Sequence, residues 1–108
     1  MKLYIGGICQ GQEELARKDN PGAEMLVSFH EAVRDALSHG EDPRVFASRV
    51  CREKPDRVIV ADEVGAGIVP IDAGERAYRE AVGRALCVIA QFSQEVWRVT
   101  CGIGVRIK

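Results

Sequence analysis

The stretch VIVADEVGAGIVP, residues 58–70, carries the clearest fold signal in this chain of 108 residues. Residues 57–62 (RVIVAD) form a nearly uninterrupted apolar run rich in β-branched side chains, which is typical of a strand covered on both faces in a parallel sheet. Asp62 and Glu63 end this run, and a glycine-containing loop follows them. Because ligands bind at the carboxyl ends of strands in open α/β sheets, the stretch predicts a buried strand and a candidate site beside it.

Toward the N-terminus, a short buried strand is expected at residues 2–5, followed by a glycine-containing loop at residues 6–11. The loop has the two glycines of a phosphate-binding loop, G-x-x-x-x-G-K-[ST], but other residues replace the lysine and the hydroxyl. The candidate nucleotide-binding residues of this segment are Gly6, Gly7, Ile8, Cys9, Gln10, Gly11, Gln12 and Glu13. The alternative is that these glycines form only a tight turn from strand to helix.

The two replacements, Gln12 and Glu13, are electrostatically adverse to phosphate binding. Gln12 removes a positive charge and Glu13 adds a negative one, each worth about 4 kcal/mol at ~4 Å and an effective dielectric constant of about 20. Two compensations are open: Arg17 or Lys18 reaches back to the loop, or Glu13 holds Mg²⁺ directly. Efficient transfer of the ATP γ-phosphate by this loop is not expected.

Asp62 and Glu63 are candidate metal ligands, because carboxylates beside a phosphate loop can hold the Mg²⁺ that accompanies a nucleotide. The alternative for Glu63 is that it caps the following glycine turn. Gly65 and Gly67 allow close approach of the backbone to a ligand, or they serve only turns with positive φ. Glu63, Gly65 and Gly67 complete the candidate nucleotide-binding set.

The remaining segments alternate between helix and strand. Helices are expected at residues 12–18, from Ala23 to about Gly40, at residues 43–54 after an Asp42-Pro43 start, and at residues 72–92. Residues 95–108 are expected to form a strand, a turn and a short terminal strand. This order predicts an α/β fold: a single domain, residues 1–108, with a small three-layer, mainly parallel sheet of three to four strands. A sheet this small exposes its edges, so a homo-oligomer is expected.

Composition excludes some classes of partner. The chain has 15 basic and 16 acidic residues, which gives no signal for a nucleic acid or a membrane as the main partner. The N-terminal MKLYI lacks the features of a signal peptide, so a cytoplasmic protein is expected. The four cysteines form no C-x-x-C pair and a zinc site is not expected. Cys87 and Cys101 have apolar neighbours in sequence and are predicted to be buried thiols.

Four further residues have a simple structural explanation beside a possible functional one. His30 is predicted to lie on the surface of an amphipathic helix and not to act as a nucleophile. His39 suits a helix C-terminus, where the helix dipole favours it. Trp97 and Arg98 could support a nucleotide base or a subunit contact, or simply belong to a half-buried strand.

Several segments resemble the bifunctional adenosylcobinamide kinase/adenosylcobinamide-phosphate guanylyltransferases of cobalamin biosynthesis. Residues 63–70 match the family's E-V-G-x-G-I-V-P segment, Gly83-Arg84 matches its G-R helix, and residues 102–108 match its terminal G-I-G-x-x-I-K-like end. The family opens with a strand and a G-G-x-x-x-G-K-S phosphate loop, which the glycines of residues 6–11 match in position.

The resemblance implies a P-loop nucleotide-binding fold, GTP or ATP with Mg²⁺ as cofactors, a corrinoid ligand, and a homo-oligomer that is trimeric in the family. The implied parent activity is phosphorylation of the adenosylcobinamide hydroxyl followed by GMP transfer. The resemblance does not extend to the family's middle portion, with its metal-binding segment and guanylylated histidine. The helical residues 23–54 stand in its place, so no catalytic residue is assigned. Three interpretations follow: a diverged homologue with weak or absent kinase activity, a non-catalytic nucleotide- or partner-binding regulatory protein, or a structural oligomer without a ligand.

Overall fold

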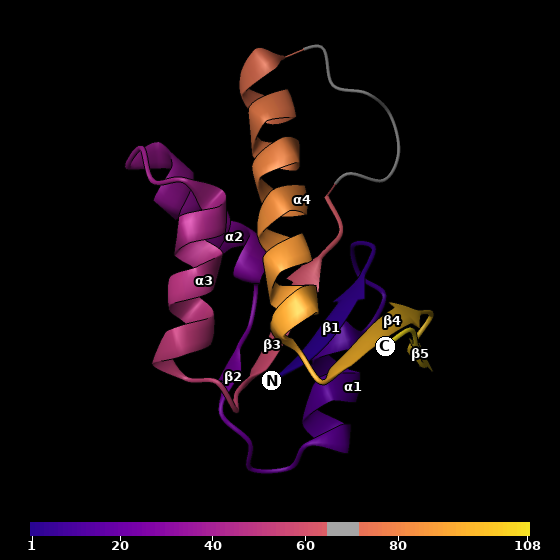
Figure 1. Cartoon of the computed structure of the whole chain (residues 1–108). Helices are drawn as coiled ribbons and strands as arrows, with labels where there is room; N and C mark the ends of the chain where they lie inside the picture. The colour runs from indigo at the N-terminus through magenta and orange to yellow at the C-terminus, as the bar shows by residue number, and fades with distance from the viewer. Residues whose placement is uncertain (65–71) are drawn as a thin grey trace.

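The computed structural model describes residues 1–64 and 72–108, and these residues have an α/β architecture (Figure 1). The strands are β1 (Lys2–Gly6), β2 (Met25–Leu26), β3 (Val58–Asp62), β4 (Glu95–Thr100) and β5 (Ile103–Arg106). The helices are α1 (Gln12–Asp19), α2 (Phe29–Ser38), α3 (Pro43–Glu53) and α4 (Ala73–Phe92). Within these residues the strands form one sheet in the order β2-β3-β1-β4-β5, in which only β5 is antiparallel to its neighbour. The predicted fold class is confirmed.

Helices cover both faces of the sheet. Leu3 and Ile59 point to one face and pack against α2, α3 and α4, whereas Tyr4 and Val60 point to the other and pack around Ala16 of α1. Successive side chains of a strand alternate between faces, so the uninterrupted apolar run of β3 supplies both cores. The three layers that the sequence predicted are therefore present.

One helix start and the strand count were predicted wrongly. A helix was expected from Ala23, but α2 begins at Phe29, and Met25–Leu26 pair in parallel with Val58–Ile59. Met25 packs against the core on the α1 face and Leu26 against the core on the opposite face, which is the alternation of a strand. This short strand raises the number of strands to five within the described residues.

The two acidic helix starts are confirmed. The Asp42 side chain accepts hydrogen bonds from the first-turn backbone N–H groups of α3, and Asp72 accepts from the N–H groups of Gly74 and Glu75 at the start of α4. These side chains satisfy backbone donors that have no partner inside the helix. None of the described helices is long and apolar enough to cross a membrane.

The prediction that Cys87 and Cys101 are buried was wrong, since both are exposed. Cys87 lies on α4, where sequence neighbours point about 100° away around the helix, so apolar neighbours do not imply burial. Cys101 lies in the two-residue turn between β4 and β5, where Cys101 and Gly102 have φ angles of 51° and 75°. Positive φ at both positions is typical of the tight type I′ hairpin turn.

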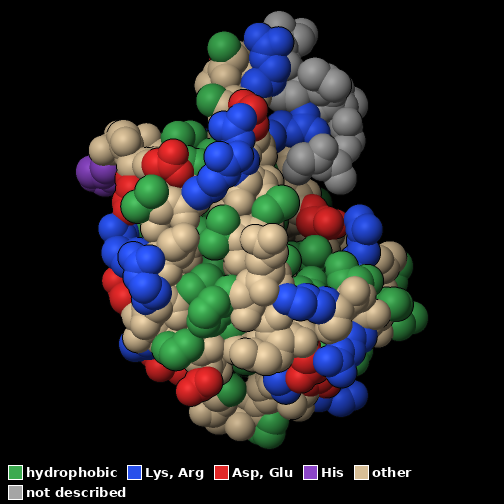
Figure 2. Space-filling model, in the orientation of Figure 1, with side chains coloured by type: hydrophobic (Ala, Val, Ile, Leu, Met, Phe, Trp, Pro, Cys, Tyr) green, Lys and Arg blue, Asp and Glu red, His purple; other side chains and the backbone are tan. Residues whose placement is uncertain are grey.

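The edge strand β5 exposes an apolar surface. Ile103, Val105 and Ile107 are 68%, 59% and 57% exposed, and residues two apart in an extended chain share a face. We call these three side chains the β5 apolar face. In Figure 2, hydrophobic side chains reach the surface at the right-hand margin, where Figure 1 places the β4–β5 hairpin. The outer edge of β5 pairs with no other described strand.

Candidate functional site

The glycine loop lies at the carboxyl ends of the parallel strands. It connects the end of β1 to the start of α1, and Gly6 is in register with Asp62 on one side and Val99 on the other. The backbone N–H of Glu63 donates to the Gly6 carbonyl oxygen at 2.8 Å. The loop and the acidic pair, Asp62 and Glu63, thus lie together at the carboxyl ends of the parallel strands, as predicted. Gly65 and Gly67, the other candidate nucleotide-binding glycines, lie outside the described residues.

Two glycines of the loop are required by its geometry. A Cβ atom on Gly6 would lie 2.5 Å from the Val99 carbonyl oxygen, which leaves no room for a side chain. Gly11 immediately precedes α1 with a φ of 87°, a conformation that glycine adopts without strain. The glycine pattern therefore specifies the strand-to-helix turn, whatever the loop binds.

Gln10 ties the loop to the turn between β4 and β5. Its backbone carbonyl oxygen accepts from the Gly102 N–H at 2.7 Å, and its side-chain Oε1 accepts from the Cys101 N–H at 2.8 Å. Segments about 90 residues apart in sequence are thereby joined beside the candidate site. The same residue lines the larger of the two cavities described below.

Gln12 is buried beneath the loop, with 5% of its surface exposed. The two N–H donors of its Nε2 are shared among Asp62 Oδ1 at 2.7 Å and the carbonyl oxygens of Gly6, Gly7 and Ala61 at 3.2, 3.1 and 3.4 Å. Its Oε1 is buried without a hydrogen-bond partner. The residue that follows Gly11, the second glycine of the phosphate-loop pattern, is thus a neutral amide whose donors are already engaged.

His30 contacts the same site, so its prediction as a surface residue was wrong. The Asp62 N–H donates to His30 Nδ1 at 3.0 Å, and His30 Nε2 lies 3.5 Å from Asp62 Oδ2. The side chain is only 12% exposed. Because Nδ1 accepts a hydrogen bond, a neutral ring carries its proton on Nε2, toward the carboxylate. The sequence has no local signal for this contact, because His30 Nδ1 accepts from a backbone N–H thirty-two residues away, on β3.

Described residues of the loop and the Asp62 end of β3 together line two cavities. The larger, about 690 Å³, is lined by Gly7, Ile8, Gln10, Asp62, Glu63, Val64, Arg98, Val99 and Thr100. The smaller, about 300 Å³, is lined by Cys9, Gly11, Gln12, Glu13, Glu14, Ser28, His30, Val60, Ala61 and Asp62. The predicted loop residues are therefore divided between the cavities, and Asp62 contributes to both.

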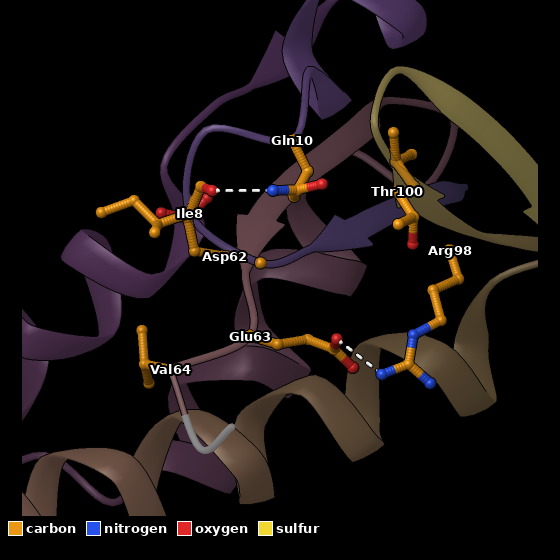
Figure 3. Close-up of a pocket in the computed structure, with 9 residues that line it drawn as sticks. Ile8, Gln10, Asp62, Glu63, Val64, Arg98 and Thr100 are labelled. Carbon is orange, nitrogen blue, oxygen red and sulfur yellow. Dashed lines mark hydrogen bonds and ion pairs between the residues drawn. The ribbon is translucent and has the colours of Figure 1, made fainter. Parts of the chain in front are cut away.

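Acidic side chains outnumber basic ones in both cavities. In the larger cavity, Arg98 Nη2 donates to Glu63 Oε2 at 3.0 Å, and the two side chains point toward one another in Figure 3. In the smaller cavity, the Glu13 carboxylate binds the guanidinium of Arg17 at 3.1 Å. An entering phosphate group therefore meets two carboxylates, those of Glu63 and Glu13, that are each already paired with a guanidinium group.

The chemistry of the acidic pair fits Mg²⁺. Asp62 and Glu63 both line the larger cavity, and Mg²⁺ bound with a nucleotide takes one or two carboxylates together with phosphate oxygens. Among the described residues, no group of three or more His, Cys, Asp or Glu side chains could hold a metal by itself. Asp62 already accepts from Gln12, and Glu63 accepts from Arg98, so a metal ion would compete with these contacts.

Comparison with known proteins identifies a family. Residues 25–107 match the family described as cobinamide kinase / cobinamide phosphate guanyltransferase. The chain is 37% identical over 79 residues to the bifunctional adenosylcobalamin biosynthesis protein CobU of Escherichia coli K12, covering 73% of this chain and 42% of that protein. It is 44% identical over 59 residues to the protein of the same name from Salmonella typhimurium LT2, covering 54% and 33%.

The chain thus spans less than half the length of these relatives. The family match begins at residue 25, after the glycine loop and α1. The loop's position at the carboxyl end of β1, before the start of α1, is that of the phosphate loop in P-loop proteins. The match covers most of the chain, and the chain belongs to the cobinamide kinase / cobinamide phosphate guanyltransferase family.

Proposed function

We propose that this chain is a diverged member of its family that binds a nucleoside triphosphate at the Gly6–Glu13 loop and has weak or absent kinase activity. The observation that carries this proposal is the buried Gln12 amide at the position of the phosphate-loop lysine. A neutral amide that donates to Asp62 and to backbone carbonyls supplies no positive charge to the β- and γ-phosphates. Glu13, beside it, adds negative charge.

The geometry of the loop supports retention of binding. The backbone N–H groups at the start of α1 follow the loop, and the positive end of a helix dipole favours phosphate. The adjoining cavity of about 690 Å³ has the volume of a small-molecule site. With Mg²⁺ present, Asp62 and Glu63 would hold the metal and reduce the repulsion between carboxylates and phosphates. We infer a corrinoid as a second ligand from the family alone.

The alternative proposal is a non-catalytic regulatory protein that binds a nucleotide or a partner. The observation that favours it is that both acidic residues lining the larger cavity already accept hydrogen bonds, Asp62 from Gln12 and Glu63 from Arg98. Carboxylates held in this way suit a site that binds a ligand without catalysing a reaction. Under this alternative, nucleotide binding would have no chemical outcome. The two proposals differ in turnover and not in binding.

Calorimetric titration with GTP and ATP, with and without Mg²⁺, tests the binding, and phosphorylation of adenosylcobinamide tests the chemistry. We expect measurable binding that Mg²⁺ strengthens, with slow or undetectable phosphorylation. Sustained turnover would contradict the assignment of weak kinase activity. Absence of heat with both nucleotides, at protein concentrations well above micromolar, would contradict the nucleotide site.

We also propose that the chain forms a homo-oligomer, trimeric by family resemblance, in which a second copy covers the β5 apolar face. An edge strand with unpaired backbone groups and three exposed aliphatic side chains is a surface that proteins normally cover or protect. Arg106 points to the opposite face, since it pairs with Trp97, so it does not interrupt the apolar surface. We propose the cytoplasm as the compartment.

A further inference from the structure

We propose that Arg98 on β4 is the phosphate-binding cation of the larger cavity, and that Glu63 withholds it until an anion enters. This inference rests on the proposed nucleotide binding and assigns to Arg98 the charge that Gln12 lacks. It concerns the recognition of the polyphosphate group by this chain.

The position of Arg98 suits this role. Arg98 is in register with Ile5, the residue before Gly6, so its strand position is next to the start of the glycine loop. Its side chain lines the larger cavity with Gly7 and Gln10 of that loop. Figure 3 shows the guanidinium directed at Glu63 across the cavity, with Thr100 beside it on the same strand. A phosphate group that enters this cavity beside Gly7 and Gln10 would therefore meet this side chain.

Arg98 is the sole lysine or arginine among the described residues that line this cavity. Residues 65–71, GAGIVPI, contribute no charged side chain in the sequence. A guanidinium remains charged at all physiological pH values and presents paired N–H donors that match phosphate oxygens. The cationic contribution to phosphate binding in this cavity is therefore assigned to Arg98.

Glu63 competes for the same guanidinium. Its Oε2 accepts from Arg98 Nη2 at 3.0 Å, and its side chain is 27% exposed against 57% for Arg98. A phosphate oxygen must displace this carboxylate to make the same contact. The exchange replaces one charge-assisted hydrogen bond by another, so the carboxylate lowers the apparent affinity for anions without abolishing it.

This arrangement predicts effects of opposite sign for the two partners. Removal of the Glu63 carboxylate frees the guanidinium and should strengthen polyphosphate binding, whereas removal of the guanidinium should weaken it. An ion pair with a purely structural role predicts no such opposition, because loss of either partner would have the same small effect on stability.

The test is calorimetric titration of the full chain with inorganic tripolyphosphate and with GTP, first without Mg²⁺ so that the metal does not bind the carboxylates. Guanosine serves as the phosphate-free probe. We expect Glu63→Gln to bind tripolyphosphate about tenfold more tightly than the parent, Arg98→Gln about tenfold less tightly, and Arg98→Lys in between. If the parent chain binds tripolyphosphate too weakly to be detected, the Glu63→Gln variant should bind it tightly enough to be measured.

The matched control is the ion pair between Arg49 of α3 and Glu41, which precedes that helix. Its side chains are 47% and 24% exposed, close to the values for Arg98 and Glu63, and neither residue lines the larger cavity. Arg49→Gln and Glu41→Gln make the same charge changes and should leave the affinity within about twofold of the parent. Thermal unfolding of each variant verifies that it is folded.

Equal affinities of the parent, Glu63→Gln and Arg98→Gln, or changes of the same sign, would overturn the assignment. So would guanosine binding as tightly as GTP. Arg98→Gln in a Gln12→Lys/Glu13→Ser background separates the two proposals. If that background binds GTP and the loss of Arg98 has no effect, the Arg98 assignment fails and the loop site stands. If no variant binds any phosphate probe, both fail.

Discussion

Gln12 lies where a phosphate loop has its lysine, and the amide nitrogen is shared between Asp62 Oδ1 and the carbonyl oxygens at the ends of β1 and β3. The loss of charge could be predicted from the sequence, because residue type alone decides it. The hydrogen bonds of the amide could not, because they depend on the pairing of two strands more than fifty residues apart. His30 was missed for the same reason, since its partner is the backbone of Asp62.

Restoring the charge at the loop should restore affinity. Gln12→Lys with Glu13→Ser adds one positive charge and removes one negative charge while every glycine is kept. We expect at least tenfold tighter binding of GTP, or about 1.4 kcal/mol. This is a fraction of the roughly 4 kcal/mol per unit charge at close range, part of which Asp62 would neutralise.

The gain should shrink as the salt concentration rises, because exposed charges are screened. Calorimetric titration at two salt concentrations measures both effects. If the double variant binds GTP and ATP no better than the parent, the loop is only a turn. A gain that is independent of salt would indicate a cause other than charge.

His30→Ala should lower the free energy of unfolding by about 1–3 kcal/mol, because the Asp62 N–H loses its acceptor in a mostly buried position. His39→Ala is the matched control. The His39 side chain is 74% exposed, so its loss should change the free energy of unfolding by about 0.5 kcal/mol or less. Denaturant unfolding measures both, and equal effects of the two substitutions would contradict the role given to His30.

Among the elements, the sequence predicted those with a single strong local signal. β3 has an apolar run, and α3 and α4 begin at capping aspartates, so each was placed correctly. β2 has only two residues, and the spacing of Leu26, Phe29 and Val33 imitates a helix. Its pairing with β3 is a long-range contact, which overrode the local pattern.

The contact of Tyr4 on β1 with the end of α1 predicts that the chain loses stability at alkaline pH. The Tyr4 hydroxyl donates to Asp19 Oδ2 at 3.0 Å and accepts from Asn20 Nδ2 at 3.1 Å. Burial raises the pKa of the Tyr4 hydroxyl above its ordinary value of 10.0, and burial also raises the pKa of Tyr78. The unfolded chain therefore loses these protons at a lower pH than the folded chain does.

Stability contributed by the protonated tyrosines should be complete below about pH 10 and should decrease as the pH rises toward the higher pKa values of the folded state. Tyr4→Phe should reduce this alkaline loss, and it should also lower stability at neutral pH by about 1 kcal/mol through its lost hydrogen bonds. Ultraviolet titration of tyrosinate, together with unfolding at several pH values, measures both. A tyrosinate midpoint at or below pH 10 in the folded chain would contradict the burial argument.

For the whole molecule, the uncovered edge of the sheet predicts self-association. Val105→Lys places a charge in the β5 apolar face and should reduce an oligomer to the 11.8 kDa chain in light scattering. Val45→Lys is the control, because Val45 on α3 is 58% exposed, close to the 59% of Val105, and lies outside that face. A parent chain that is monomeric at micromolar concentration, or dissociation by both substitutions alike, would contradict the proposed interface.

The central claim is that the glycine loop of this family member is a nucleotide site whose lysine has been replaced. Backbone amide NMR during titration with GTP and Mg²⁺ tests it most directly, because the shifts locate the ligand. We predict that the largest shifts fall at Gly6–Gln12, at Asp62 and Glu63, and at Arg98 of β4, which surround the two cavities beside the loop. Shifts that are absent at saturating GTP, or that are confined to α3 or to the β5 apolar face, would contradict the claim.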